Sequence, residues 1–225
     1  MASLAIHICI ANEINKVIKR NSNELLIGTM APDISKLVGE TKLNSHFLNS
    51  IDNDVPNLAK FLNKYGNYLD DDFVLGYYIH ICVDYLWFKY FIPSITGSIT
   101  DYKQVKKLDG TVEKYEKQTY DYYVYSDYAN LNVQLLEKYD FPMYIFNEEI
   151  PNMPNIISEV PMDRLDLIVN SAKKYFEKGK VSKSHVFEIN GITMFIERSK
   201  ELILEEIKKL YEKNPNYHPN SGRSR

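Results

Sequence analysis

Residues 75–88 read LGYYIHICVDYLWF, an apolar and aromatic stretch interrupted only by His80 and Asp84. Four positions separate the two residues, so on an α-helix their side chains lie on the same face, one turn apart. A polar side chain that is buried without a partner destabilises a fold. The pair therefore needs either a mutual hydrogen bond or a metal ion, and its surroundings predict a buried central helix over residues 69–92.

Both ends of this helix have sequence signals. The acidic run at 70–72 suits its first turn, because the helix dipole favours anions there. Gly76 lies one turn before His80, where glycine is tolerated if another helix or a ligand must come close. Pro93 is predicted to end the helix.

The overall composition is that of an ordinary globular protein. The 225 residues are 44% hydrophobic and 25% charged with a net charge of −3, enough to build a core in a single domain. No block of positive charge occurs, so binding to duplex nucleic acid is not expected. Tyrosine is unusually common, with 18 residues, and its apolar ring and polar tip suit the edge of a core or a cleft.

The sequence predicts a cytoplasmic protein with reduced cysteines. The first 20 residues read as an amphipathic helix rather than a signal peptide, and no apolar run reaches the roughly 18 residues of a membrane span. Cys9 and Cys82 are too few for a disulfide framework. They are predicted to be small buried residues, with thiolate metal ligands as the alternative.

Apolar periodicity predicts further helices around the central one. They are expected at 3–20, 54–65, 120–139, 162–178 and 191–213. Residues 93–119 contain an Asp-Gly pair between short alternating runs, which predicts a small hairpin or irregular insertion. The fold class is therefore an all-α bundle forming one domain over residues 1–213, followed by a disordered tail at 214–225.

The segment ELLIGTMAPDI, residues 24–34, ends in a predicted bend that carries Asp33. Gly28 suits the end of a helix, and Pro32 restricts Ala31 to extended conformations. Asp33 has a simple interpretation as a turn former or helix N-cap. Its alternative role is that of a metal ligand.

Histidine and aspartate residues in the first third of the chain are candidates for one shared site. His7 falls on the buried stripe of the first helix, and His46 lies in a polar segment. Each of them alone can be a hydrogen-bonded core residue. Combined with Asp33, His80 and Asp84 they form a set that Zn²⁺, Mn²⁺ or Fe²⁺ accepts, which predicts a divalent metal site if the side chains converge.

The order of these residues is distinctive. A histidine on the first helix is followed by GTMAPD, then by SHF around His46 and by HICVD at 80–84. This order resembles the zinc-dependent phospholipase C family, whose fold includes the S1/P1 nucleases, and the resemblance covers residues 5–92. It implies a helical bundle of the phospholipase C/P1 nuclease type in which all five candidate residues bind one or two ions. Asp33, His46, His80 and Asp84 would form the main site, and His7 would hold a second ion with Asp84 as the bridge.

Later ligands of that family have no counterpart here. The family has a histidine six residues after the helical aspartate, and this position is Tyr90. A later histidine and glutamate one helical turn apart are missing too, since Glu188 stands only three positions after His185. A complete three-metal site is therefore not expected, although Asp127 on a later helix offers a spare carboxylate.

The predicted function is a metal-dependent phosphoesterase similar to phospholipase C. The metal would activate water and hold phosphoryl oxygens, with Asp33 accepting the proton of the water. The expected substrate is a small phosphoester, a phosphodiester or a phospholipid headgroup. Two alternatives remain open. One is an HD-type nucleotide phosphohydrolase, a class that needs the adjacent His-Asp pair that this chain lacks. The other is a non-catalytic helical module fixed by a metal ion or by a His80–Asp84 hydrogen bond.

Overall fold

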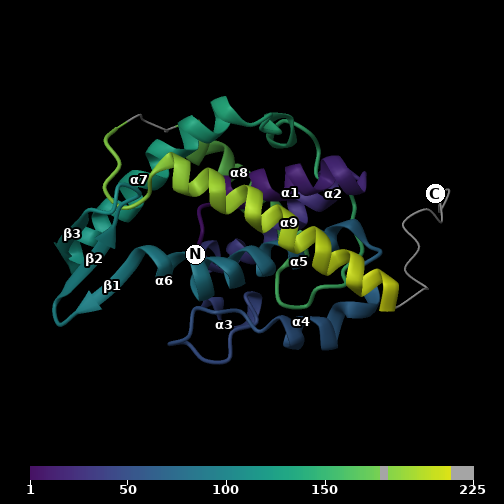
Figure 1. Cartoon of the computed structure of the whole chain (residues 1–225). Helices are drawn as coiled ribbons and strands as arrows, with labels where there is room; N and C mark the ends of the chain where they lie inside the picture. Colours follow the sequence, from purple (N-terminus) through teal and green to yellow (C-terminus); the bar gives the residue numbers. More distant parts are fainter. Residues whose placement is uncertain (178–181, 214–225) are drawn as a thin grey trace.

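The computed structural model describes residues 1–177 and 182–213 and is mostly helical, with one small antiparallel sheet (Figure 1). The α-helices are α1 Leu4–Ile18, α2 Ser22–Met30, α3 Lys42–Ser45, α4 Leu58–Tyr65, α5 Asp72–Leu86, α6 Ile92–Ile95, α7 Lys117–Lys138, α8 Leu165–Glu177 and α9 Ile189–Lys213. The short 3₁₀ helices are η1 Ala31–Leu37, η2 Gly66–Tyr68, η4 Met143–Phe146 and η5 Met162–Arg164, and η3 Trp87–Phe91 is a π-helical turn. The strands are β1 Thr96–Ile99, β2 Tyr102–Lys106 and β3 Val112–Glu116. The predicted helical character is confirmed, whereas the predicted tail at 214–225 lies outside the described residues.

Helices α2 and α5 pack against each other at the centre of the molecule at unusually short range. A Cβ atom on Gly76 would lie 1.9 Å from the carbonyl oxygen of Leu25, and one on Gly28 would lie 2.1 Å from that of Phe73. Only glycine permits this approach. The close contact predicted at Gly76 is therefore made by another helix. The prediction that Gly28 ends a helix is wrong, because α2 continues to Met30.

Helices α1 and α9 complete the core around this pair. Ser3 caps α1 by accepting a hydrogen bond from the backbone N–H of Ile6, and α1 contacts α2, α5 and α9. The buried side of α9 follows helical spacing, as predicted, and consists of Ile192, Phe195, Ile196, Ser199, Ile203 and Ile207. Within the described residues no helix is both long and apolar enough to cross a membrane.

The predicted insertion is a three-stranded sheet in the order β1-β2-β3 at one end of the molecule (Figure 1). The strands pair antiparallel, with Thr96 opposite Val105 and Val105 opposite Glu113. The Asp-Gly pair makes the second turn, in which Gly110 has a φ of 86° and Asp109 accepts a hydrogen bond from Thr111 N–H. The hairpin prediction is thus confirmed, with one strand more than a simple hairpin.

Two proline predictions are wrong for related reasons. Pro93 does not end the central helix, because the π-turn leads into α6 and Pro93 occupies the first turn of that helix. Ala31 is helical, with φ −55° and ψ −39°, and Pro32 lies at the start of η1. A proline in the first turn of a helix removes an N–H that would have no partner there. The helix expected at 54–65 begins only at Leu58, since its N-cap is Asn57.

Candidate metal centre

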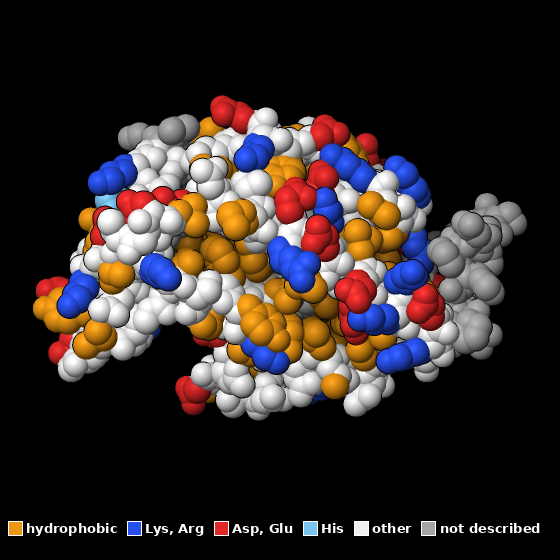
Figure 2. All heavy atoms as spheres, viewed as in Figure 1, with side chains coloured by type: hydrophobic (Ala, Val, Ile, Leu, Met, Phe, Trp, Pro, Cys, Tyr) orange, Lys and Arg blue, Asp and Glu red, His pale blue; other side chains and the backbone are white. Residues whose placement is uncertain are grey.

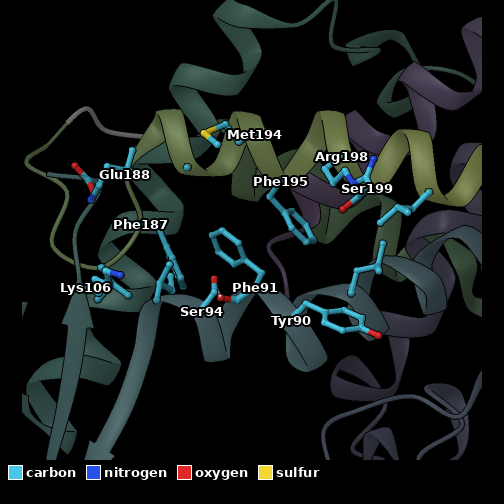
Figure 3. Close-up of a pocket in the computed structure, with 16 residues that line it drawn as sticks. Tyr90, Phe91, Ser94, Lys106, Phe187, Glu188, Met194, Phe195, Arg198 and Ser199 are labelled. Carbon is cyan, nitrogen blue, oxygen red and sulfur yellow. Dashed lines mark hydrogen bonds between the residues drawn. The ribbon is translucent and has the colours of Figure 1, made fainter. Parts of the chain in front are cut away.

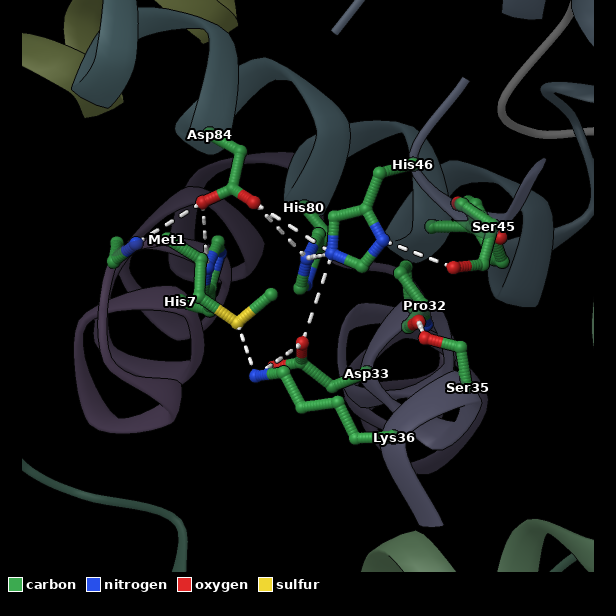
Figure 4. A network of polar contacts seen from close by, with 12 residues as sticks. Met1, His7, Pro32, Asp33, Ser35, Lys36, Ser45, His46, His80 and Asp84 are labelled. Carbon is green, nitrogen blue, oxygen red and sulfur yellow. Dashed lines mark hydrogen bonds and ion pairs between the residues drawn. The ribbon is translucent and has the colours of Figure 1, made fainter. Parts of the chain in front are cut away.

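The five predicted ligands come from four elements and meet at one place (Figure 4). His7 lies on α1, Asp33 on η1, and His46 at the C-terminal cap of α3, while His80 and Asp84 both project from α5. None of the five is more than 6% exposed. The convergence that the sequence predicts is therefore present in the fold.

Asp84 links the two parts of this cluster. Its Oδ1 atom lies 3.3 Å from Nε2 of His7, and its Oδ2 atom lies 3.6 Å from Nε2 of His46. Oδ2 also lies 3.8 Å from Nε2 of His80, too far for a hydrogen bond. The mutual hydrogen bond that would explain the His80–Asp84 pair is therefore not formed. The backbone N–H of Ala2 donates to Oδ1 at 3.1 Å.

The distances between ligand atoms match those around a small cation. Nε2 of His46 lies 3.3 Å from Nε2 of His80 and 3.6 Å from Oδ1 of Asp33. Ligand atoms placed 2.0–2.1 Å from a tetrahedral Zn²⁺ ion are roughly 3.3 Å apart. Two overlapping groups, His7–His80–Asp84 and Asp33–His46–His80, each keep one ligand atom per residue within 4.8 Å of the others.

A backbone contact, a side-chain contact and ring stacking fix the orientation of the histidine rings. Nδ1 of His80 donates to the carbonyl oxygen of Thr29 at 2.7 Å, which leaves the lone pair of Nε2 directed into the cluster. Nδ1 of His46 lies 2.9 Å from the hydroxyl of Ser45. The rings of His7 and His80 are stacked, with centroids 3.8 Å apart and planes 2° from parallel. Such fixed rings are typical of metal-binding histidines.

The electrostatic environment keeps the cluster in the protonation state that binds cations. Burial alone would raise the pKa of Asp84, but the neighbouring His7 and His80 outweigh it and hold that pKa well below its usual range. Burial would also raise the pKa of Asp33, but His46 and His80 outweigh this effect and lower that pKa. Burial lowers the pKa of His80, and His7 lowers it further. The lowered pKa values of Asp33 and Asp84 favour ionised carboxylates and that of His80 favours a neutral ring, the forms that bind a metal ion.

Several buried polar atoms of the cluster lack hydrogen bonds. Within the part of the chain that the structure describes, neither ring nitrogen of His7 nor Oδ1 of Asp33 makes a hydrogen bond of good geometry. Nε2 of His7 has the 3.3 Å contact with Asp84, and Oδ1 of Asp33 has a 3.4 Å contact with Lys36. Buried polar groups in native proteins are almost always satisfied, so each exception calls for an explanation. A cation held among these nitrogen and oxygen atoms would satisfy them, and the donor set therefore fits a divalent ion.

A cleft of about 700 Å³ lies beside the cluster. Asp33 is the cluster residue that lines it, together with Lys36 and Lys42. Nζ of Lys36 lies 3.4 Å from Oδ1 of Asp33. Two further carboxylates, Asp54 and Asp121, line it as well. The aromatic part of the wall consists of Trp87, Phe88, Tyr120, Tyr125, Tyr128, Tyr175 and Phe187. The high tyrosine content indicated such a wall, but no pattern in the sequence indicated which tyrosines form it.

The later candidates of the sequence do not join the cluster. The carboxylate of Asp127 is fully buried and accepts hydrogen bonds from the backbone N–H groups of His185, Val186 and Phe187. Asp127 therefore anchors a backbone segment and is not a spare metal ligand. The ring of His185 stacks on Tyr123 at a centroid distance of 3.8 Å.

The cysteines are buried and free, as predicted. Burial raises the pKa of Cys82 to about 12 and raises that of Cys9 as well, so both stay protonated. Neither belongs to a ligand group among the described residues. Their role is packing.

Comparisons of the chain with protein-family models, with curated proteins and with solved structures found no match. No relative supplies a function for this chain, so a function is inferred from its own residues, above all from the cluster and its cleft.

Proposed function

We propose that this protein is a metal-dependent phosphoesterase whose buried cluster holds one or two divalent ions, with Zn²⁺ as the first candidate. The observation that supports this most strongly is the meeting of three imidazoles and two carboxylates, none more than 6% exposed, beside a cleft. The resemblance of their order to that of zinc-dependent phospholipase C and the S1/P1 nucleases supports the same reaction class.

The contacts favour a division of the ligands between two ions. Oδ2 of Asp84 is near His46 and His80, and these three residues with Asp33 would hold the first ion. Oδ1 of Asp84 faces His7, so this pair would hold a second ion with Asp84 as the bridge. Mn²⁺ and Fe²⁺ accept the same ligands.

The bound metal would lower the pKa of a coordinated water and neutralise phosphoryl charge. Residues of the chain supply the proton acceptor and the contacts with the substrate. Asp33 is ionised and lines both cluster and cleft, so it is the carboxylate placed to accept a proton. Lys36 and Lys42 are the cations of the cleft that would attract an anionic phosphoester, and Asp54 and Asp121 in the same lining offset part of their charge. The aromatic wall contacts the rest of the substrate and limits the access of water.

Elemental analysis and a turnover assay test this proposal together. Protein purified without chelator, or reconstituted with Zn²⁺ or Mn²⁺, should carry about one to two ions per chain. It should hydrolyse p-nitrophenyl phosphate or bis(p-nitrophenyl) phosphate, and the pair of substrates separates monoesterase from diesterase activity. Asp33→Asn, compared with the wild type at equal metal content because Asp33 is also placed as a ligand, should lower kcat at least 100-fold, since general-base catalysis contributes about 10² to 10⁴. His185→Gln, which lies outside the cluster, is the matched control and should retain both metal and activity.

A metal-stabilised module without catalytic activity is the second candidate. It is favoured by the near-complete burial of His7, His46, His80 and Asp84, each no more than 1% exposed, which leaves only Asp33 at the cleft. His80→Ala separates the two proposals. If the protein is an enzyme, the wild type hydrolyses the esters and His80→Ala does not. If it is a structural module, the wild type does not hydrolyse them, and His80→Ala only lowers the melting temperature. Metal binding without hydrolysis of either ester would favour the module.

A further inference from the structure

A second cavity, of about 440 Å³, lies between α9, the α6 region and strand β2 (Figure 3). Phe187 lines both this cavity and the cleft beside the metal cluster. The surface view shows hydrophobic side chains gathered in a depression between α9 and α6 (Figure 2). The size of the cavity falls within the range of roughly 300–1,000 Å³ that is typical of small-molecule sites.

The walls of this cavity are apolar, and its rim exposes large apolar side chains. Phe91 and Phe195 pack against each other in one wall, with ring centroids 4.9 Å apart. Leu108 and Met194 line it although they are 55% and 67% exposed. Covering such side chains is favourable in proportion to the apolar area removed from water. An apolar occupant is therefore stabilised along most of the cavity.

One end of the cavity is polar. Ser199 on α9 is only 2% exposed, and its hydroxyl makes no hydrogen bond among the described residues. Arg198 lies next to it on the same helix (Figure 3). Among the described residues the guanidinium pairs with Glu201 alone, at 3.0 Å, and both side chains are more than 60% exposed, so this ion pair is weak. A buried hydroxyl and a weakly engaged guanidinium suit a carboxylate.

Lys106 adds a second positive charge to the lining and has no ion pair within the described ranges. The one acid in the lining, Glu188, already accepts a hydrogen bond from the backbone N–H of Leu108. Its carboxylate keeps its negative charge, so the lining holds two cations and one anion and its net charge is positive.

We propose that this cavity binds a single-chain carboxylate, a medium-chain fatty acid, with its carboxylate at Arg198 and Ser199 and its alkyl chain along the apolar wall that Phe91 and Phe195 form with Leu108 and Met194. A neutral hydrocarbon would leave the Arg198 guanidinium and the Ser199 hydroxyl without a polar partner in the ligand. The proposal is independent of the proposed phosphoesterase activity.

The protein carries its own probe for this test. Trp87 is the only tryptophan, and its ring lies 5.2 Å from those of Phe187 and Phe195, both of which line the cavity. Titration of the full chain with dodecanoate should change the tryptophan fluorescence saturably, with one molecule bound per chain by calorimetry. Octanoate and hexadecanoate define the preferred chain length. Dodecanol, which has no charge, should bind at least tenfold more weakly.

Three substitutions test whether dodecanoate binds in this cavity. Arg198→Met keeps the apolar stem and removes the charge, so it should weaken binding of dodecanoate at least tenfold and leave dodecanol unchanged. Lys208→Met, at an exposed position of α9 outside the cavity, is the matched control and should bind as the wild type does. Gly191→Leu should weaken both ligands, because a Cβ at Gly191 has only Leu108 Cδ2, at 4.0 Å, as a neighbour and the added side chain can fill the cavity.

The absence of saturable binding of dodecanoate would overturn the proposal, and so would equal affinities for dodecanoate and dodecanol. Equal affinity of Arg198→Met and the wild type for dodecanoate would overturn it as well. Sedimentation that shows a dimer through this face, with no binding of dodecanoate, would assign the cavity to a second copy instead.

Discussion

His80 is the residue on which the candidate metal centre depends most. It belongs to both ligand groups, its Nδ1 atom is fixed by the carbonyl oxygen of Thr29, and its ring stacks on that of His7. The sequence predicted its partnership with Asp84, because the spacing of four residues places both on one face of a helix. The mutual hydrogen bond that was one explanation of the pair does not form, since the two side chains are 3.8 Å apart.

Asp127 allows a test of its structural role. Replacement by Asn should lower the free energy of unfolding by about 2–3 kcal/mol, because the charged acceptor of the N–H groups at 185–187 is lost. The metal content should stay the same, since Asp127 belongs to neither ligand group. Urea unfolding and elemental analysis measure the two quantities.

Asp109→Asn is the control for this variant, because Asp109 also accepts a backbone hydrogen bond but is exposed. It should change stability by less than about 0.5 kcal/mol. A loss of metal from Asp127→Asn would contradict the structural role.

Some residues of the site carried no signal in the sequence. Lys36 contacts Asp33 at a spacing of three residues, which is common on any helix and indicates nothing by itself. Tyr125 and Tyr175 reach the cleft from α7 and α8, far along the chain from the ligands. Only the tertiary packing of these helices brings them to the site.

At the scale of elements, the close pairing of α2 and α5 positions the cluster. Thr29 from α2 orients His80 on α5, and the hydroxyl of Thr29 lies 3.1 Å from the carbonyl oxygen of Gly76. Asp33 follows α2 directly in η1. A change in the separation of these two helices would therefore displace ligands from both.

Gly76→Ala tests this dependence. The added Cβ would lie 1.9 Å from the carbonyl oxygen of Leu25, so the helices must separate, and we expect the free energy of unfolding to fall by about 3 kcal/mol or more. Metal affinity should fall together with stability. Denaturant unfolding and metal titration provide the measurements.

Gly66→Ala is the matched control, because its Cβ would meet only the side chain of Leu62 at 3.8 Å. The φ of Gly66 is −56°, which alanine adopts without strain. This variant should be neutral or slightly stabilising. Equal stability of Gly76→Ala and the wild type would contradict the close-packing account.

Local sequence patterns predict some helices correctly and some helix ends wrongly. The helices with a clear apolar stripe, α1 and α9, lie where periodicity predicts them. Pro32 and Pro93 were interpreted as helix breakers, yet each lies in the first turn of a helical segment. The difference arises because a proline stops a helix or starts the next one depending on tertiary contacts, which the local sequence does not contain.

In the whole molecule, two hollows with different chemistry share Phe187 in their lining. One is an aromatic cleft with acidic and basic residues beside the cluster, and the other is an apolar cavity with cations in its lining. The first hollow contains a residue of the predicted ligand set, Asp33. The second combines residues of the insertion with residues of the last helix, and no motif predicted it.

Diffraction from crystals grown with Zn²⁺, measured on both sides of the zinc absorption edge, tests the central claim most directly. We expect an anomalous peak within about 2.0–2.2 Å of Nε2 of His46, Nε2 of His80 and carboxylate oxygens of Asp33 and Asp84. A second peak beside His7 would show the two-ion arrangement. Crystals with no anomalous peak at the cluster, or with zinc bound only at surface residues, would contradict the account.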